Sequence, residues 1–287
     1  MLSEIEGFVN WTRRRNPETR TWRDYGYDLH QFARSVNNLE PGKVRFSDVD
    51  RFVCEQLNRG FKATTINRRL VAILSFYAFL ADSDSALVCP VRMHRHHLRE
   101  PQHLPRPVQE DDLRAFFACI NDTRDKAMFA LMLRCGLRIS EVASLQICDL
   151  YLLEPRPRML IRGKGSRERS VYLSPQSEQV LRLYLFERPK VACEHVFLSY
   201  QMKGMSTTAI HKRLMRYRAQ ANVYLTAHRL RHSFANDLLC ADVPVTTIQK
   251  LLGHRWLETT QIYVTANDHQ VQADYYAACL KIEGWVV

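Results

Sequence analysis

Apolar residues recur at helical spacing through the first third of the chain. The first run contains Phe8, Trp11, Tyr25, Leu29, Phe32 and Val36, the second Val49, Phe52, Val53 and Leu57, and the third Ile66, Leu70, Ile73, Leu74, Tyr77 and Leu80. Steps of three and four residues place such side chains on one face of a helix. Residues 1–98 are therefore predicted to form a helical domain.

The pattern changes after residue 98. Residues 99–107 are proline-rich without periodicity, which is typical of an interdomain linker. Residues 108–287 combine patterns typical of strands and of helices. Two strands are expected around a GKGS turn and helices elsewhere, with Gly136 where a left-handed helix C-cap is expected. The predicted helices cover 110–119, 123–134, a segment opening at Ser140 and Glu141, 175–188, 206–221, a segment after Thr226, 244–252 and 258–265, and the strands 158–163 and 168–173. The predicted fold class is mainly α (α+β), a helical N-terminal domain followed by a mixed, mostly helical domain with a small β-sheet.

The charge of the chain indicates a polyanionic binding partner. The formal net charge is +11, and the surplus is divided: the first 105 residues hold 16 Lys and Arg against 12 Asp and Glu, and the rest hold 25 against 18. A surplus of this size on a globular chain favours nucleic acid. Two basic modules joined by a short linker are suited to closing around a duplex.

Polar residues gather at the start of the third apolar run. They are Lys62, Thr64, Thr65, Asn67, Arg68 and Arg69, and either Thr64 or Thr65 is predicted to cap the helix. Lys and Arg contact phosphates, while Asn and Thr reach base edges. These six residues are therefore predicted to contact DNA. The alternative, an ordinary amphipathic surface helix, stays open.

Several other classes of protein are disfavoured. No secretory signal peptide and no run of 18 apolar residues is found, so no membrane span is expected. Eight scattered cysteines without a CxxC pair indicate reduced thiols and a cytoplasmic protein. His94, His96 and His97 have no cysteine or acidic cluster to complete a metal site, so a solvated basic linker is the favoured interpretation.

Six residues in the second part fit one chemical task. They are Arg138, Lys164, His228, Arg231, His254 and Tyr263. Two arginines, two histidines and a lysine can surround one phosphate, and a tyrosine can attack it. A phosphodiester gains negative charge in its transition state, so its cleavage depends on positioned cationic donors. His228 and Arg231 are three residues apart and share a helix face.

The strings around these residues, LRCGLRISEVASL, RGKGSRER, TAHRLRHSFA, LLGH and TTQIY, resemble the tyrosine recombinase (phage integrase) family, and within it the Xer-like site-specific recombinases. The resemblance implies that Arg138, Arg231 and His254 bind the scissile phosphate and that Tyr263 is the nucleophile. It also implies that His228 contacts the phosphate and accepts the tyrosine proton, and that Lys164 protonates the leaving 5′ oxygen. Glu141 is expected to orient basic site residues, the alternative being a solvated acid. Arg162, Arg167 and Arg169 are expected to grip the DNA backbone.

The resemblance implies strand exchange through a 3′-phosphotyrosyl intermediate and a Holliday junction, with neither metal nor cofactor. The implied partners are double-stranded DNA with paired inverted sites and a homotetramer on two duplexes. A related recombinase or accessory protein is a further possible partner. The setting stays open between chromosome or plasmid dimer resolution, transposon resolution and integration. Two alternatives remain: a topoisomerase-like nicking and sealing enzyme of type IB, and an inactive DNA-binding relative.

Some positions depart from the family pattern. Cys135 and Ala227 stand where Thr and Pro are more usual, and Trp256 replaces a small residue. None of these removes a catalytic group. Residues 267–282 are predicted to form a helix that docks into the next subunit of the tetramer, with docking onto its own domain as the alternative.

Overall fold

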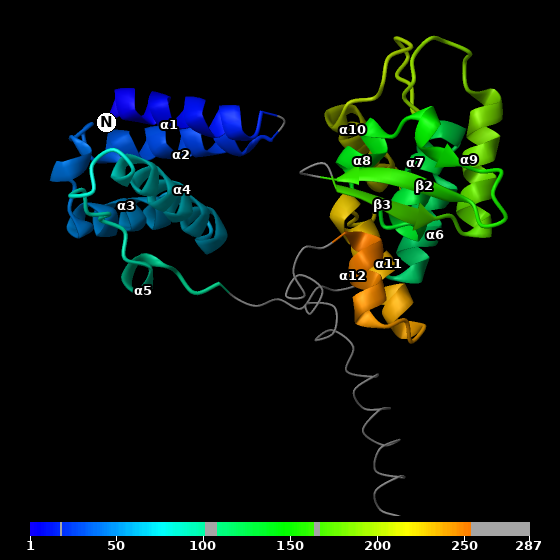
Figure 1. The fold of residues 1–287 in the computed structure, drawn as a ribbon. Coiled ribbons are helices and arrows are strands. Elements are labelled where there is room, and N and C mark those ends of the chain that lie inside the picture. Colours follow the sequence, from blue (N-terminus) through cyan, green and yellow to red (C-terminus); the bar gives the residue numbers. More distant parts are fainter. Residues whose placement is uncertain (18, 101–107, 164–166, 254–287) are drawn as a thin grey trace, which may run out of the picture. The chain divides into compact units, whose positions relative to one another are not determined.

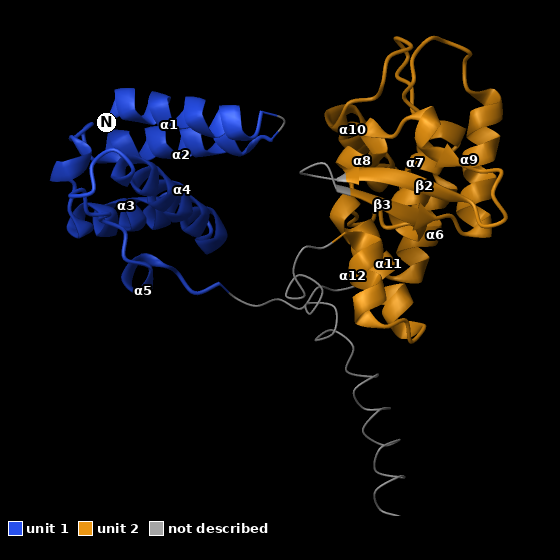
Figure 2. Cartoon of the chain, in the orientation of Figure 1, with its two compact units in different colours: residues 1–102 blue, residues 103–287 orange. Residues whose placement is uncertain are grey.

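The structure is a computed structural model that describes residues 1–17, 19–100, 108–163 and 167–253. The chain forms two compact units, residues 1–102 and 103–287 (Figure 2). The fold is mainly helical with one small antiparallel sheet, as the sequence predicts (Figure 1). The helices expected at 258–265 and 267–282 lie outside the described residues.

The first unit is helical wherever it has regular structure. Its elements are α1 (Leu2–Arg15), α2 (Thr21–Ser35), a 3-10 turn (Pro41–Lys43), α3 (Phe46–Asn58), α4 (Ala63–Ala81) and α5 (Met93–His96). The apolar stripes meet in one core, in which Phe8, Phe32, Phe52 and Phe76 are each at most 1% exposed. Burying aromatic side chains of this size is the main stabilising contribution to such a domain.

Helix α4 begins earlier than its threonines suggest. Its N-cap is Lys62, and the helix starts at Ala63, so the prediction that Thr64 or Thr65 caps the helix is wrong. The Lys62 carbonyl already accepts the first hydrogen bonds of the helix, because Thr65 and Ile66 donate their backbone N–H groups to Lys62 O. Both threonines therefore lie in the first helical turn.

The second unit combines helices with one sheet. Its helices are α6 (Glu110–Ala118), α7 (Thr123–Arg134), α8 (Ile139–Ser144), α9 (Pro175–Glu187), α10 (Thr207–Gln220), α11 (Ala227–Cys240) and α12 (Val245–Leu252). Its strands are β1 (Leu150–Tyr151), β2 (Arg158–Gly163) and β3 (Arg167–Tyr172), and a 3-10 turn covers Ile147–Asp149. The sheet order is β1-β2-β3, antiparallel throughout, with Met159 opposite Val171.

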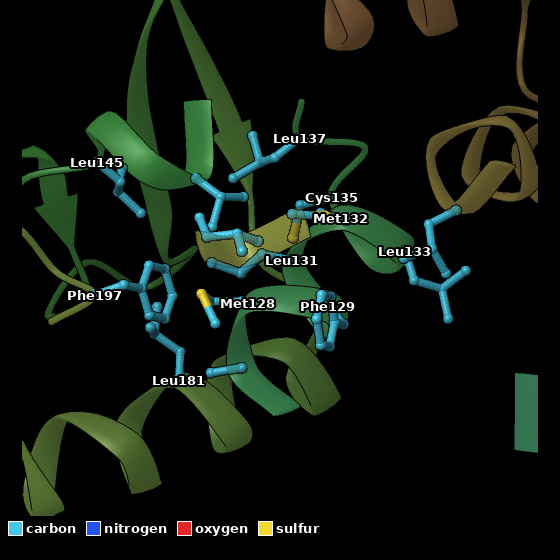
Figure 3. Close-up of a cluster of buried hydrophobic side chains, with 14 of the residues drawn as sticks. Met128, Phe129, Leu131, Met132, Leu133, Cys135, Leu137, Leu145, Leu181 and Phe197 are labelled. Atoms are coloured by element: carbon cyan, nitrogen blue, oxygen red, sulfur yellow. The ribbon is translucent and has the colours of Figure 1, made fainter. Parts of the chain in front are cut away.

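Helix α7 is the centre of this second core. Met128, Phe129, Leu131 and Met132 are completely buried, and Figure 3 shows them with Leu137, Leu181 and Phe197 from neighbouring segments. The strands contribute alternate residues, since Met159, Ile161 and Val171 point into the same cluster. The turn after α7 and the strand β3 are thereby fixed to one rigid body.

Gly136 ends α7 as predicted, for two physical reasons. Its φ is +64°, in the left-handed region that glycine adopts without steric cost. A Cβ there would also lie 2.4 Å from Cδ1 of Phe234 in α11 and 3.0 Å from Cδ2 of Leu252 in α12. The glycine therefore allows α11 and α12 to approach the turn that leads into Arg138.

Candidate active site

Glu141 brings together arginines from distant parts of the chain. Arg138 is the N-cap of α8, and its Nη1 and backbone N–H donate to Glu141 Oε1 and Oε2, both at 2.8 Å. Arg231, from the second turn of α11, lies with its Nη1 3.8 Å from Glu141 Oε2. The two arginines of the sequence-based set thus meet at one carboxylate.

The same arginines also hold the end of α12. Arg231 donates to Leu252 O and to Gly136 O, both at 2.5 Å, and Arg138 Nη1 lies 3.5 Å from Leu252 O. Gly136 O lies in the turn after α7, whereas Leu252 O belongs to the last turn of α12, where carbonyls have no helical N–H groups left to accept from. Gly253, with φ +65°, then turns the chain out of the helix immediately before His254.

The two arginines differ in exposure. The Arg231 side chain is 4% exposed and is fixed by backbone carbonyls, whereas the Arg138 side chain is 41% exposed and can meet a ligand from solvent. With Arg169, three guanidinium groups surround a single carboxylate. The surplus of positive charge suits a phosphate, because guanidinium groups grip its oxygens in pairs.

Glu141 is buried and ionised. Burial alone would raise its pKa, but the hydrogen bonds and charges of Arg169 and Arg138 outweigh burial and lower the pKa to about 2. The side chain is only 5% exposed, which excludes the alternative of a solvated acid. A permanently charged carboxylate at this place can hold the arginines in fixed directions.

His228 lies beside the arginine pair, in the first turn of α11. Its ring is exposed, yet its pKa is lowered, first by partial burial and then by the positive charges of Arg231 and Arg138. The ring of His232 meets it edge to face, with centroids 4.3 Å apart and an interplanar angle of 88°. A neutral imidazole in this position can accept a proton.

His232 was not among the residues selected from the sequence. It is four residues after His228, and this helical spacing was the signal that could have revealed it. Burial, followed by the charges of His228, Arg231 and Arg229, lowers its pKa to about 4. His232 is therefore neutral at physiological pH.

Lys164, His254 and Tyr263 lie outside the described residues. The residues next to Lys164 and His254 are described: Gly163 pairs with Arg167 in the β2–β3 register, so Lys164 belongs to the connection between these strands. His254 follows Gly253 directly. The flanking segments of Lys164 and His254 thus both belong to the unit that holds Arg138, His228 and Arg231.

Arg169 departs from the prediction that it grips DNA. Its side chain is 13% exposed and turns inward, where it donates to both oxygens of Glu141. It is removed from the DNA-contacting set because its donors are already used inside the protein. Arg162 stays 55% exposed, with Asp149 3.1 Å away and Glu168 3.5 Å away. The side chain of Arg167 is not described.

The polar start of α4 divides into two groups. Lys62, Thr64 and Arg68 are exposed and Thr65 is partly so, and Arg68 is held by two hydrogen bonds of 2.5 and 3.0 Å to the Asp28 carboxylate. Asn67 and Arg69 do not fit the DNA-contacting prediction, because they are 6% and 3% exposed. Asn67 forms hydrogen bonds with Leu98 and Glu100. Arg69 donates to Gln56 Oε1 and forms an ion pair with Asp28, with Nε 3.5 Å from Oδ1.

The described residues were also predicted to lack a metal site, disulfides and a membrane span. Within the part of the chain that the structure describes, no group of three or more His, Cys, Asp or Glu side chains could hold a metal ion, and seven cysteines are free thiols. No helix placed by the structure is long and apolar enough to cross a membrane. The histidine-rich segment is not a solvated linker, because His96 is buried in α5, 3.3 Å from Asp50.

Comparisons with known proteins place this site in a class. Residues 106–270 match the model of the phage integrase family, and residues 5–83 match its N-terminal SAM-like domain. A tyrosine recombinase of Agathobacter rectalis is 30% identical over 265 residues, which are 86% of either chain. The tyrosine recombinase XerC of Listeria innocua serovar 6a is 29% identical, over 91% of this chain and 92% of its own.

A solved structure has the same fold. It is the XerH site-specific recombinase bound to a palindromic difH substrate, with a TM-score of 0.79 at 20% identity, covering 97% of this chain and 84% of that one. Fold, site and relatives together define a tyrosine recombinase. The chain belongs to the phage integrase family.

Proposed function

We propose that this protein is a site-specific DNA recombinase in which Tyr263 is the nucleophile and Arg138, Lys164, His228, Arg231 and His254 act on the scissile phosphate. The observation that carries the proposal is the meeting of Arg138 and Arg231 at Glu141 and at Leu252 O, two residues before His254. Guanidinium groups held at one point match the charge that develops on a phosphodiester.

The chemistry follows from the residue types. Tyr263 oxygen forms a bond to phosphorus while the bond from phosphorus to the 5′ oxygen breaks, leaving a 3′-phosphotyrosyl link. His228 accepts the phenol proton, and Lys164 donates a proton to the leaving 5′ oxygen. A 5′-hydroxyl of the partner duplex then attacks the link and releases Tyr263. Since one phosphodiester replaces another, neither an external energy source nor a metal ion is required.

We assign a separate task to each domain. Residues 1–98 bind DNA through Lys62, Thr64, Thr65 and Arg68 of α4, residues 99–107 connect, and residues 108–287 catalyse, with Arg162 and Arg167 on the DNA backbone. The XerH neighbour is bound to a palindromic substrate. We infer by analogy a duplex with paired inverted sites, a homotetramer on two duplexes joined through residues 267–282, and action in the cytoplasm on chromosomal, plasmid or transposon DNA.

A strand-exchange assay tests this function. Two labelled duplexes carrying the recognition site are incubated with the protein, and Holliday junctions and recombinant products are separated by electrophoresis. We expect both products. Relaxation of supercoiled DNA without strand exchange at any site would favour a topoisomerase-like enzyme, and DNA binding without any cleavage would favour an inactive relative.

A further inference from the structure

Arg169 uses one guanidinium group to bind two other elements. Nη1 donates to Glu141 Oε1 at 2.8 Å and Nη2 to Glu141 Oε2 at 2.9 Å, which is a bidentate pair. Nε donates to Leu251 O at 2.9 Å. The carboxylate belongs to α8, the carbonyl to the last turn of α12, and Arg169 itself to β3. One side chain therefore fixes a strand to the ends of two helices.

The three contacts are those on which the arginine pair depends. Arg138 bonds to the same two oxygens of Glu141, so Arg169 approaches a carboxylate that also orients Arg138. Leu251 O, which Arg169 holds, is adjacent to Leu252 O, which Arg231 holds. Without Arg169, the carboxylate would lose its bidentate partner and the last turn of α12 would lose one of its donors.

From these contacts we infer that Arg169 is a positioning residue for DNA cleavage, acting through Glu141 and α12 on Arg138 and Arg231 without touching DNA. The inference rests on the proposed function. Arginine is required because one planar fork reaches both carboxylate oxygens while Nε remains for the carbonyl. Lysine at this position keeps the charge but, as a point charge without the fork, cannot make this set of contacts.

A contact with DNA and a positioning role predict different measurements. Loss of a phosphate contact weakens binding to every DNA sequence. It also reduces the slope of log affinity against log salt concentration by about one. Loss of positioning leaves affinity and salt dependence unchanged and slows the chemical step, because only groups that act in the transition state lose their alignment. Arg162→Met, on the neighbouring strand, provides the comparison for a lost DNA contact.

The test uses the full chain and a nicked suicide substrate under single-turnover conditions. We expect Arg169→Lys and Arg169→Met to bind the duplex with wild-type salt dependence and to form the covalent adduct at least tenfold more slowly at saturating DNA. Glu141→Gln and the double variant Arg169→Met/Glu141→Gln complete a cycle. If Arg169 acts through Glu141, the double variant is hardly slower than the slower single variant.

Each contrary outcome is recognisable. Two results would overturn the inference. One is a reduced salt dependence of DNA binding in Arg169→Lys or Arg169→Met. The other is a double variant whose fold-loss in cleavage rate equals the product of the two single-variant losses. Thermal unfolding identifies variants that fail to fold, and Arg169→Lys, which keeps its charge, is the variant on which the rate comparison rests. If the wild type itself forms no adduct that depends on Tyr263, the proposed function fails, and this inference fails with it.

Discussion

At the scale of single residues, the site depends on one carboxylate. Glu141 accepts hydrogen bonds from Arg138 and Arg169 and lies within 3.8 Å of Arg231. Removing the acid from such a buried cluster takes away the negative charge that its arginines share, which is more costly than losing a surface ion pair. Glu141 is thus as important for the stability of the second unit as for the direction of its arginines.

Glu141→Gln is expected to lower the free energy of unfolding in a pH-dependent way. The folded pKa is about 2, against 4.5 ordinarily, so ionisation stabilises the fold above about pH 4.5 and this stabilisation is lost as the pH falls toward 2. The linked contribution at pH 7 is on the order of 3 kcal/mol. Urea unfolding at several pH values measures it, with the exposed Glu6→Gln as control. A deficit of equal size at pH 7 and pH 3 would contradict this account.

Residue types and spacing singled out Arg138, His228 and Arg231 from their local strings, and the structure brings the two arginines together at Glu141. Residue types and spacing failed for Asn67, Arg69 and Arg169, which looked like DNA-facing cations and amides. Their partners are distant in sequence: Asp28 is about forty residues before Arg69, and Glu141 is 28 residues before Arg169. A polar side chain turns inward only when the fold brings it such a partner, and local pattern does not contain that information.

At the scale of elements, α4 joins its unit to the start of the linker. The Asn67 amide mimics a backbone pair: Nδ2 donates to Leu98 O, and Oδ1 accepts from Leu98 N, both at 2.9 Å. Nδ2 also donates to Glu100 Oε1 at 2.7 Å. The first residues of the predicted linker are therefore held against the helix expected to contact DNA.

Asn67→Ala is expected to release this segment. Three hydrogen bonds of roughly 0.5–1.5 kcal/mol each hold the Leu98 backbone and the Glu100 side chain, on either side of the exposed Arg99. Their loss should raise the rate of trypsin cleavage after Arg99 by about tenfold, measured by mass spectrometry under native conditions. Thr64→Ala, on the exposed first turn of α4, is the matched control. Equal cleavage rates in both variants would show that Asn67 does not hold the linker.

At the scale of the whole molecule, each unit has its own core, and periodicity was sufficient to predict both. The expected helices at 110–119, 123–134 and 175–188 agree within about a residue with α6, α7 and α9, because their apolar stripes face one buried cluster. The strands at 158–163 and 168–173 were similarly close to β2 and β3. Periodicity could not predict that Arg138 and Arg231 meet, because their meeting depends on how α8, α11 and α12 pack around Gly136.

The most direct test of the central claim is covalent trapping on a nicked DNA duplex. The protein is incubated with fragments from its own genomic neighbourhood, and SDS-stable protein–DNA adducts are isolated and digested to locate the linked residue. The account predicts an adduct at Tyr263 that Tyr263→Phe abolishes while DNA affinity stays unchanged. An adduct that persists in Tyr263→Phe, or one attached to another residue, would contradict it.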